Sequence, residues 1–225
     1  MAIRFVLFLL IFILSTIHHV TGQQHILFNY SLDEGLPQSS ILSIYQDRVG
    51  NIWLGTQGGV SKYNGNTFVN FDTRHGLGDN HISAILQDSR GRYWFGHRYN
   101  GLTCMQQQKF RHYNFINNQI TSLAEDKFGN LWIGTLEKGL FLLPHNYDES
   151  DPGFLRLDTH LDFPQTDIFD IKQDSEGTLL IASWKGLTLA ETSQSPEDIS
   201  LHTFNTENSE LPFTEVLSIA ALADQ

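Results

Sequence analysis

A repeat of about forty residues constrains the fold of this chain more than any other feature of its sequence. Four segments align along the 225 residues, with leading residues Ile41, Ile82, Ile120 and Ile168. Each carries an Asp six residues after its leading Ile and a Gly three residues later. Three continue with Trp and then Gly, whereas the fourth has Leu180 and Ala182 there. We predict structural roles for the shared positions, which are Asp47, Gly50, Trp53, Gly55, Asp88, Gly91, Trp94, Gly96, Asp126, Gly129, Trp132, Gly134, Asp174 and Gly177.

Each unit is predicted to form four short strands. Asp-x-x-Gly is typical of a tight turn, because Asp accepts hydrogen bonds from turn amides and Gly tolerates a positive φ. The segment with Trp then forms a second strand, whose aromatic ring packs between neighbouring units. A Gly before Val or Leu opens a third strand, and an apolar segment such as Phe68–Phe71 supplies the outer one. Four-stranded units of this length indicate an all-β fold, a β-propeller, whereas linear solenoids have shorter repeats.

The repeat also predicts an incomplete ring of about four blades plus the start of a fifth. An apolar residue lies five positions before each leading residue, and Leu211 repeats this spacing before Val216. A truncated unit therefore begins at Val216. Near the other end, His25–Asp33 resembles an outer strand without its three inner strands. We expect the chain to be the front of a longer domain, because an unpaired blade edge promotes aggregation.

The first 22 residues are predicted to be a signal peptide. One basic residue, Arg4, precedes an apolar run over Phe5–Ile17 that is shorter than the roughly 20 residues that span a bilayer. Small residues at Val20 and Gly22 place cleavage before Gln23, and an uncleaved anchor is the alternative. The propeller repeats would then occupy residues 23–225, in the periplasm or elsewhere outside the cytoplasm.

Composition argues against several functional classes. The chain has 14 basic and 25 acidic residues, a net charge of −11, so nucleic acid is not an expected partner. The single cysteine excludes a disulfide framework within the chain. Apart from His18 and His19, which lie in the predicted signal peptide, we find no close pair of metal-ligating histidines. We also find no catalytic motif, and we predict no catalytic residue, metal or cofactor. Asp-x-x-Gly lacks the carboxylate density of a calcium loop and is better explained as a turn.

Alternating strand direction predicts where a ligand would bind. The loop before each first strand and the loop joining the second and third strands share one face, here named the loop face; the Asp-x-x-Gly turns form the opposite turn face. Amide, aromatic and charged groups on the loop face suit polyhydroxylated ligands. The predicted ligand-binding residues are His97, Arg98, Tyr99, Trp184, Lys185, Gln57, Glu137, Lys138, Asn80 and His81. For Asn80, capping of the backbone at the strand start is the alternative role.

The pattern from Gly35-Leu36-Pro37 through Ile41, Asp47 and Trp53 to Gly59 resembles the two-component regulator propeller repeat. The resemblance covers residues 25–225, with departures at His97 and at Leu180, Ala182 and Ser183. It implies an extracytoplasmic sensor region that precedes a membrane helix and an output module, commonly a histidine kinase. Family ligands are often glycans or their breakdown products. None of the output machinery lies in these residues.

The resemblance therefore implies a ligand-sensing propeller region of a membrane signal-transduction protein, which responds to a small molecule or oligosaccharide. Contact with the membrane would come only through downstream segments, and a homodimer is a further expectation. Two alternatives stay open: an exported propeller enzyme that acts on glycans, and a non-catalytic interaction scaffold.

Overall fold

The computed structural model describes residues 28–157, 163 and 166–220, and this part of the chain folds into four antiparallel sheets of four strands. The sheets are named blades one to four. Blade one contains β1 (Ile41–Gln46), β2 (Ile52–Thr56), β3 (Val60–Tyr63) and β4 (Phe68–Phe71). Blade two contains β5 (Ile82–Gln87), β6 (Tyr93–His97), β7 (Leu102–Gln106) and β8 (Lys109–Tyr113). Blade three contains β9 (Ile120–Glu125), β10 (Leu131–Thr135), β11 (Leu140–Leu143) and β12 (Leu155–Arg156). Blade four contains β13 (Ile168–Gln173), β14 (Leu179–Ser183), β15 (Gly186–Glu191) and β16 (Ser200–Phe204).

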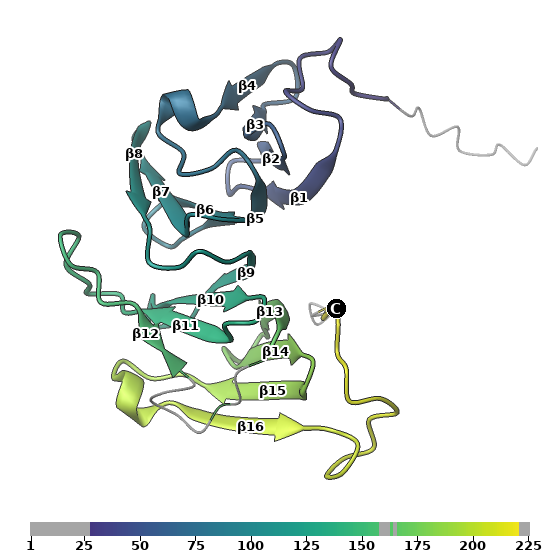
Figure 1. Ribbon diagram of the computed structural model, residues 1–225, viewed down its shortest axis with the longest axis vertical. Helices are drawn as coiled ribbons and strands as arrows, with labels where there is room; N and C mark the ends of the chain where they lie inside the picture. The colour runs from purple at the N-terminus through teal and green to yellow at the C-terminus, as the bar shows by residue number, and fades with distance from the viewer. Residues whose placement is uncertain (1–27, 158–162, 164–165, 221–225) are drawn as a thin grey trace, which may run out of the picture.

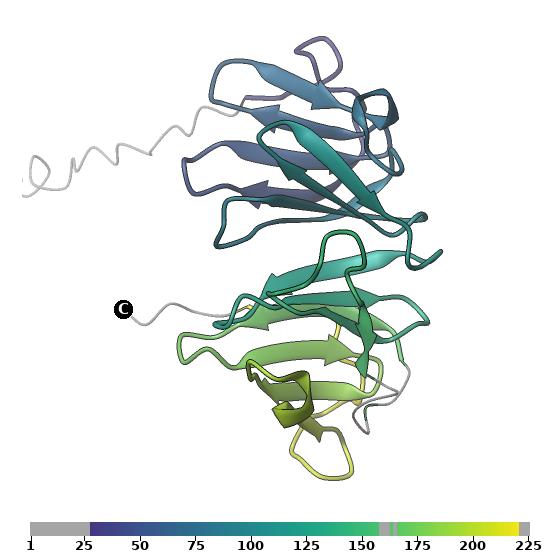
Figure 2. The ribbon, with the colours of Figure 1, turned by 90° about the vertical axis from the view of Figure 1, so that its left-hand side faces the viewer.

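The blades follow one another around part of a ring, with their first strands on the inside (Figure 1). β1 contacts β5, β5 contacts β9, and β9 contacts β13. Seen from the side, the sheets are stacked as successive layers (Figure 2). The ring is open in the described residues: Ile44 of β1 is 70% exposed, whereas Leu123, at the same position of blade three, is 8% exposed. The predicted all-β propeller with an incomplete ring is confirmed.

A buried tryptophan lies in each interface between consecutive blades, as the repeat predicts. Trp53 packs with Ile82 and Phe95 of blade two, and Trp132 packs with Ile168 and other apolar residues of blade four. Trp94 fills the interface between blades two and three. Burying an aromatic side chain of this size contributes several kcal/mol, so these three rings supply much of the cohesion between blades (about 3–5 kcal/mol is typical for loss of such a side chain).

A close approach between blades explains the glycine at the end of the second strand. At Gly96, an added Cβ would lie 2.5 Å from Cγ2 of Ile120, the leading residue of blade three. At Gly134 the corresponding contact with Ile168 would be 2.7 Å. A side chain there would push the next blade outward, so these positions require glycine.

Blade four forms in spite of its departures from the repeat. The hydroxyl of Ser183 donates to the carbonyl of Gly186 at 3.0 Å, as the hydroxyl of Thr56 does to Gly59 at 2.9 Å. Leu180 is half-buried on the face that holds tryptophan in the other blades. Serine therefore preserves the hydrogen bond of the β14–β15 loop.

Two predictions concern the N-terminal part of the chain: a signal peptide and an outer strand. The predicted signal peptide, residues 1–22, lies outside the described residues. The outer strand expected over His25–Asp33 is not formed where the structure describes it, from Phe28 onward. Instead, the Tyr30 ring packs against Tyr63 and Phe68 at 5.1 and 5.6 Å, and the two tyrosine hydroxyls are 2.8 Å apart. Ring packing against the end of blade one replaces strand pairing. No helix in the described part of the chain is long and apolar enough to cross a membrane.

The segment from Val216 occupies the place of a fifth unit without forming a strand over its described residues, 216–220. The amide of Ile219 donates to Oδ2 of Asp170 at 3.2 Å. One blade earlier, the amide of Ile171 donates to the hydroxyl of Ser122 at 3.0 Å. Because Ile219 and Ile171 both lie three residues after the leading residue of their units, the contact between units is repeated.

In blades one to three, the aspartate of the Asp-x-x-Gly turn fixes the buried tryptophan of its own blade. Oδ1 of Asp126 accepts the amides of Phe128 and Asn130 at 2.9 Å, and Oδ2 accepts Nε1 of Trp132 at 2.9 Å. The Asp47–Trp53 and Asp88–Trp94 pairs repeat this bond at 2.9 and 2.8 Å. The sequence analysis identified the turn and the ring but not the bond between them.

We expect Trp132→Phe to lower the free energy of unfolding by about 2–4 kcal/mol. The substitution leaves a cavity between blades three and four and removes one hydrogen bond to a buried carboxylate. Chemical denaturation followed by circular dichroism measures the change. Trp184→Phe, at a half-exposed tryptophan, is the matched control, and an equal loss in both variants would contradict the role of the Asp126–Trp132 bond.

Candidate functional site

The loop face is assembled by backbone hydrogen bonds between the two kinds of loop that form it. The amide of Arg98 donates to the carbonyl of His81 at 3.1 Å, and that of Leu136 to Gln119 at 3.0 Å. In blade four, the amide of Trp184 donates to Asp167 at 3.2 Å. Each bond ties the loop before a first strand to the loop joining the second and third strands. The two loops therefore lie side by side.

Aromatic and charged side chains are exposed on this face. Tyr99 of blade two is 51% exposed and Trp184 of blade four is 49% exposed. The Arg98 guanidinium lies 5.6 Å from the centre of the Tyr99 ring, and its Nε donates to the Tyr99 hydroxyl at 3.1 Å. The Trp184 ring packs against Phe169 at 6.1 Å. Gln57, Glu137, Lys138 and Lys185 are also exposed.

Two predicted binding residues of blade two are partly used by the fold. The side-chain oxygen of Asn80 accepts the amide of Thr73 at 2.8 Å, which is a capping role. His81 is half-buried beside Asp79, and its burial lowers the pKa of the imidazole. Both retain some exposure, so binding through them stays a prediction.

His97 differs from the other predicted residues because its ring is completely buried. Its Nε2 lies 2.7 Å from the hydroxyl of Thr103, within blade two. Its Nδ1 and Oδ2 of the nearby Asp79 are both buried without a hydrogen-bond partner in the described residues. Burial lowers the pKa of His97 to about 4, against a smaller opposing effect of Asp79. The structure thus places His97 inside the blade and not on the loop face.

Two kinds of reactive group were sought among the described residues: a metal-binding cluster and a reactive thiol. These residues hold no group of three or more His, Cys, Asp or Glu placed to bind a metal ion. The thiol of Cys104 is buried, and burial raises its pKa to about 12, so it is not the thiolate that a nucleophile requires.

The sequence analysis missed a cavity of about 380 Å³ at the ring axis. It is lined by the first strands of all four blades. Hydroxyl groups of Ser43, Ser83 and Thr121 line it, and the Lys172 ammonium lies 3.2 Å from Oδ1 of Asp170. The alternation of polar and apolar residues in the leading segments was the available signal.

The burial of His97 generates a pH prediction. Because its folded-state pKa is below its ordinary value, the unfolded chain binds more protons, and stability falls as the pH drops from about 6.5 to 4. We expect His97 to account for about 3 kcal/mol of this loss. His97→Gln should flatten the pH dependence of the denaturation midpoint across this window. The same exchange at the exposed His202 is the control, and an unchanged slope in the His97 variant would contradict the assignment.

The comparisons identify the repeats. Residues 35–58, 76–99 and 114–137 match the family described as "Two component regulator propeller". These stretches lie in the first three units; the fourth, with Leu180 and Ala182, is not among them. A 35-residue stretch is 49% identical to Histidine kinase P4 from Formosa agariphila, and it covers 16% of this chain and 3% of that protein.

Solved structures are similar over most of the chain. One is the extracellular domain of BT3049 from B. thetaiotaomicron, described as a hybrid two component system (TM-score 0.63, 20% identity), and 81% of this chain covers 24% of it. The corresponding domain of BT4673 has a TM-score of 0.54 and 26% identity over 73% of this chain and 22% of that one. Virginiamycin B lyase from Staphylococcus aureus has a TM-score of 0.59 at 14% identity, covering 77% of this chain and 59% of the lyase.

The lyase and BT3049 share only the fold at these identities, and this chain spans less than a quarter of either sensor domain. The matched repeats and the four-stranded blades agree on the same assignment. The first three repeats of this chain therefore match the two-component regulator propeller family.

Proposed function

We propose that this chain is the ligand-sensing propeller region of a two-component signal-transduction protein and that it acts outside the cytoplasm. The three matched repeats carry the proposal, supported by the similarity to extracellular domains of hybrid two-component systems. A short apolar run at Phe5–Ile17 fits export. The segment itself is proposed to be non-enzymatic, with the catalytic output elsewhere in a longer protein.

The proposed ligand is an oligosaccharide or a related small molecule bound on the loop face. Exposed Tyr99 and Trp184 offer flat apolar rings, on which sugar faces stack, and Arg98, Glu137 and Lys138 offer hydrogen-bonding groups beside them. The backbone bonds between adjacent loops hold these groups on the rigid ends of strands. Asn80 and His81 are half-buried in the loop before β5 and would contact a ligand that reaches between the loops.

Signalling would follow from a change in blade packing or in dimer contacts. A ligand shifts an equilibrium only by binding two arrangements unequally. The loop face suits this requirement because its groups come from blades two, three and four, so that a ligand touching more than one blade depends on their spacing.

Cell fractionation tests the membrane-sensor proposal directly. We expect an antibody against residues 60–140 to detect a membrane band far larger than the 25.6 kDa of this chain. A soluble band near that mass would contradict the proposal and favour the interaction scaffold.

Titration calorimetry with an oligosaccharide panel tests the proposed ligand face. We expect Tyr99→Ala and Trp184→Ala each to weaken binding about five- to thirtyfold, because each removes a stacking surface of about 1–2 kcal/mol. Tyr63→Ala, at an aromatic residue on the outer part of blade one, is the control. Equal affinity in all variants would contradict a binding site on this face. Cleavage products of the oligosaccharides in the same solutions would indicate an enzyme.

A further inference from the structure

Blade two carries an unusual concentration of positive charge. Between Asp88 and Glu125 the sequence contains no acidic residue, although the chain as a whole has a net charge of −11. The same stretch contains Arg90, Arg92, Arg98, Lys109 and Arg111, five of the 14 basic residues. An anion approaching this chain is therefore repelled by most of the surface and attracted to this blade.

Three of these cations line one pocket on the side of the blades away from the loop face. It has a volume of about 410 Å³ and is bounded by β7, β8 and the loop between β11 and β12. Arg92, Lys109 and Arg111 supply its positive charge, and Tyr113 and Tyr147 supply hydroxyl groups. The loop that closes it, residues 144–154, is the longest connection between third and outer strands in the four blades. The pocket is thus specific to the interface between blades two and three.

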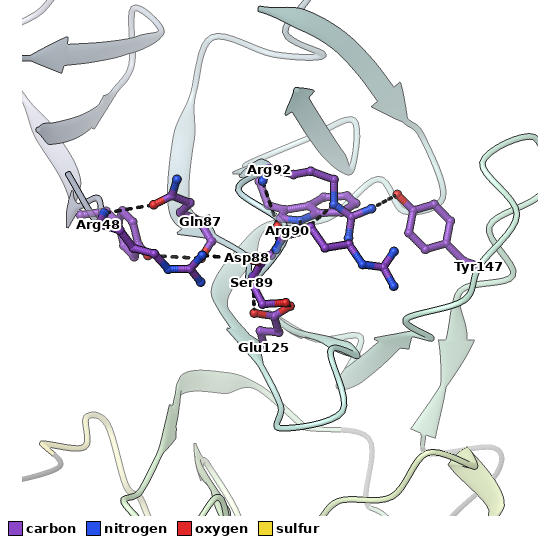
Figure 3. A network of polar contacts seen from close by, with 10 residues as sticks. Arg48, Gln87, Asp88, Ser89, Arg90, Arg92, Glu125 and Tyr147 are labelled. Carbon is purple, nitrogen blue, oxygen red and sulfur yellow. Dashed lines mark hydrogen bonds and ion pairs between the residues drawn. The ribbon is translucent and has the colours of Figure 1, made fainter. Parts of the chain in front are cut away.

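Arg92 is the fixed cation of the pocket, with 8% of its surface exposed. Its Nε donates to Oδ2 of Asp88 at 2.6 Å and its Nη1 to the Tyr147 hydroxyl at 2.9 Å (Figure 3). The guanidinium also lies over the Trp94 ring, 5.1 Å from its centre. A guanidinium has five N–H donors, and these contacts engage two of them. The Asp88 carboxylate pairs with the charge of Arg92, so what Arg92 offers to an oxyanion is its unused N–H donors.

The other two cations are at the rim, and one of them, Arg111, is engaged by Glu149, whose main-chain carbonyl also accepts its Nη1 at 2.9 Å. Arg111 pairs with Glu149 at 2.9 Å, but both side chains are about half exposed (50% and 56%), and such pairs are weak. The Glu149 carboxylate, which also lines the pocket, shows that an oxyanion fits against Arg111. Lys109 is exposed and has no side-chain hydrogen bond or ion pair in the described residues.

The hairpin turn beside the pocket has a sequence that its geometry does not favour. Gln107 and Gln108 connect β7 to β8 with φ values of 48° and 62°, a conformation usually taken by Asn-Gly. Gln107 lines the pocket and would offer an amide donor to a ligand. Gln107 thus occupies a strained backbone position next to three cations, and strained positions of this kind cluster at ligand-binding sites.

We propose that this pocket binds a small molecule through a carboxylate, sulfate or phosphate group. Arg92 and Arg111 would hold the oxyanion, with Lys109 and Gln107 at the rim. The Glu149 carboxylate is the internal competitor that the ligand displaces from Arg111. The site goes beyond the proposed function because it lies apart from the loop face and does not depend on the sensing of a sugar there.

Titration calorimetry of the full chain with sodium sulfate, inorganic phosphate and glucuronate, in a chloride buffer of constant ionic strength, tests this site. The three probes distinguish which oxyanion is preferred. For the best of them we expect Lys109→Gln and Arg111→Gln each to weaken binding at least fivefold. Glu149→Gln should strengthen it several-fold, because the competing charge is gone. All three residues are exposed, so folding is not at risk.

Arg48→Gln and Lys127→Gln remove the same charge from exposed positions outside the pocket and outside the loop face, and they are the matched controls. We expect both to bind the probe as the parent chain does. A loss in the Arg48 or Lys127 variant equal to that of Arg111→Gln would show general screening and overturn the proposal. Two further results would overturn the proposal: no heat of binding with any of the three probes at millimolar concentration, or a Glu149→Gln variant that binds the probe more weakly than the parent chain. Because sulfate and phosphate carry no sugar ring, failure with these two probes leaves the loop-face proposal untouched.

Discussion

The hydrogen bond between the turn aspartate and the buried tryptophan is the constraint on which the rest of the structure depends. A carboxylate in this position would be costly to bury without partners, and the turn amides and the indole N–H supply them. For Asp47, these bonds, with one from Tyr93 of the next blade, outweigh the effect of burial and lower the pKa to about 2. One side chain thus sets the turn, the rotamer of the ring and, through Tyr93, the neighbouring blade.

The rest of the blade follows from where that ring lies. Trp94 fills the space between blades two and three, and Gly96, two residues on, lets Ile120 approach the same strand. Trp94, a large residue, and Gly96, which has no side chain, therefore lie two positions apart in one short strand. Their order fixes how each blade sits on the next, which leaves the loops free to differ between blades without loss of the fold.

Much of this architecture could be predicted from the sequence, because a repeated pattern reports the same local constraint several times. The strand β4, predicted as Phe68–Phe71, has those bounds in the structure. Features that occur only once in the chain were harder to predict from the sequence. Nothing in the spacing indicated that His97, at a position where other blades have Thr or Ser, would turn inward to Thr103, and the long loop that places Tyr147 beside Arg92 has no counterpart in the other blades. Tyr30 resembled a strand residue by pattern alone, yet ring packing on Tyr63 decides its place.

Each of the two proposed sites is lined by residues of more than one blade, so each could report to the rest of the protein. Polar contacts link the turns of successive blades: Arg48 donates to Gln87, and Ser89 donates to Glu125 (Figure 3). The Arg92 pocket lies between blades two and three, the interface that the Ser89–Glu125 contact also spans, and its walls come from blade two and from a loop of blade three. A ligand held by both walls must bind more tightly at one spacing of the blades than at another, whereas a ligand held within one blade is indifferent to that spacing. Since only unequal binding can shift an equilibrium, a site shared between blades is the kind that couples occupancy to the shape of the ring.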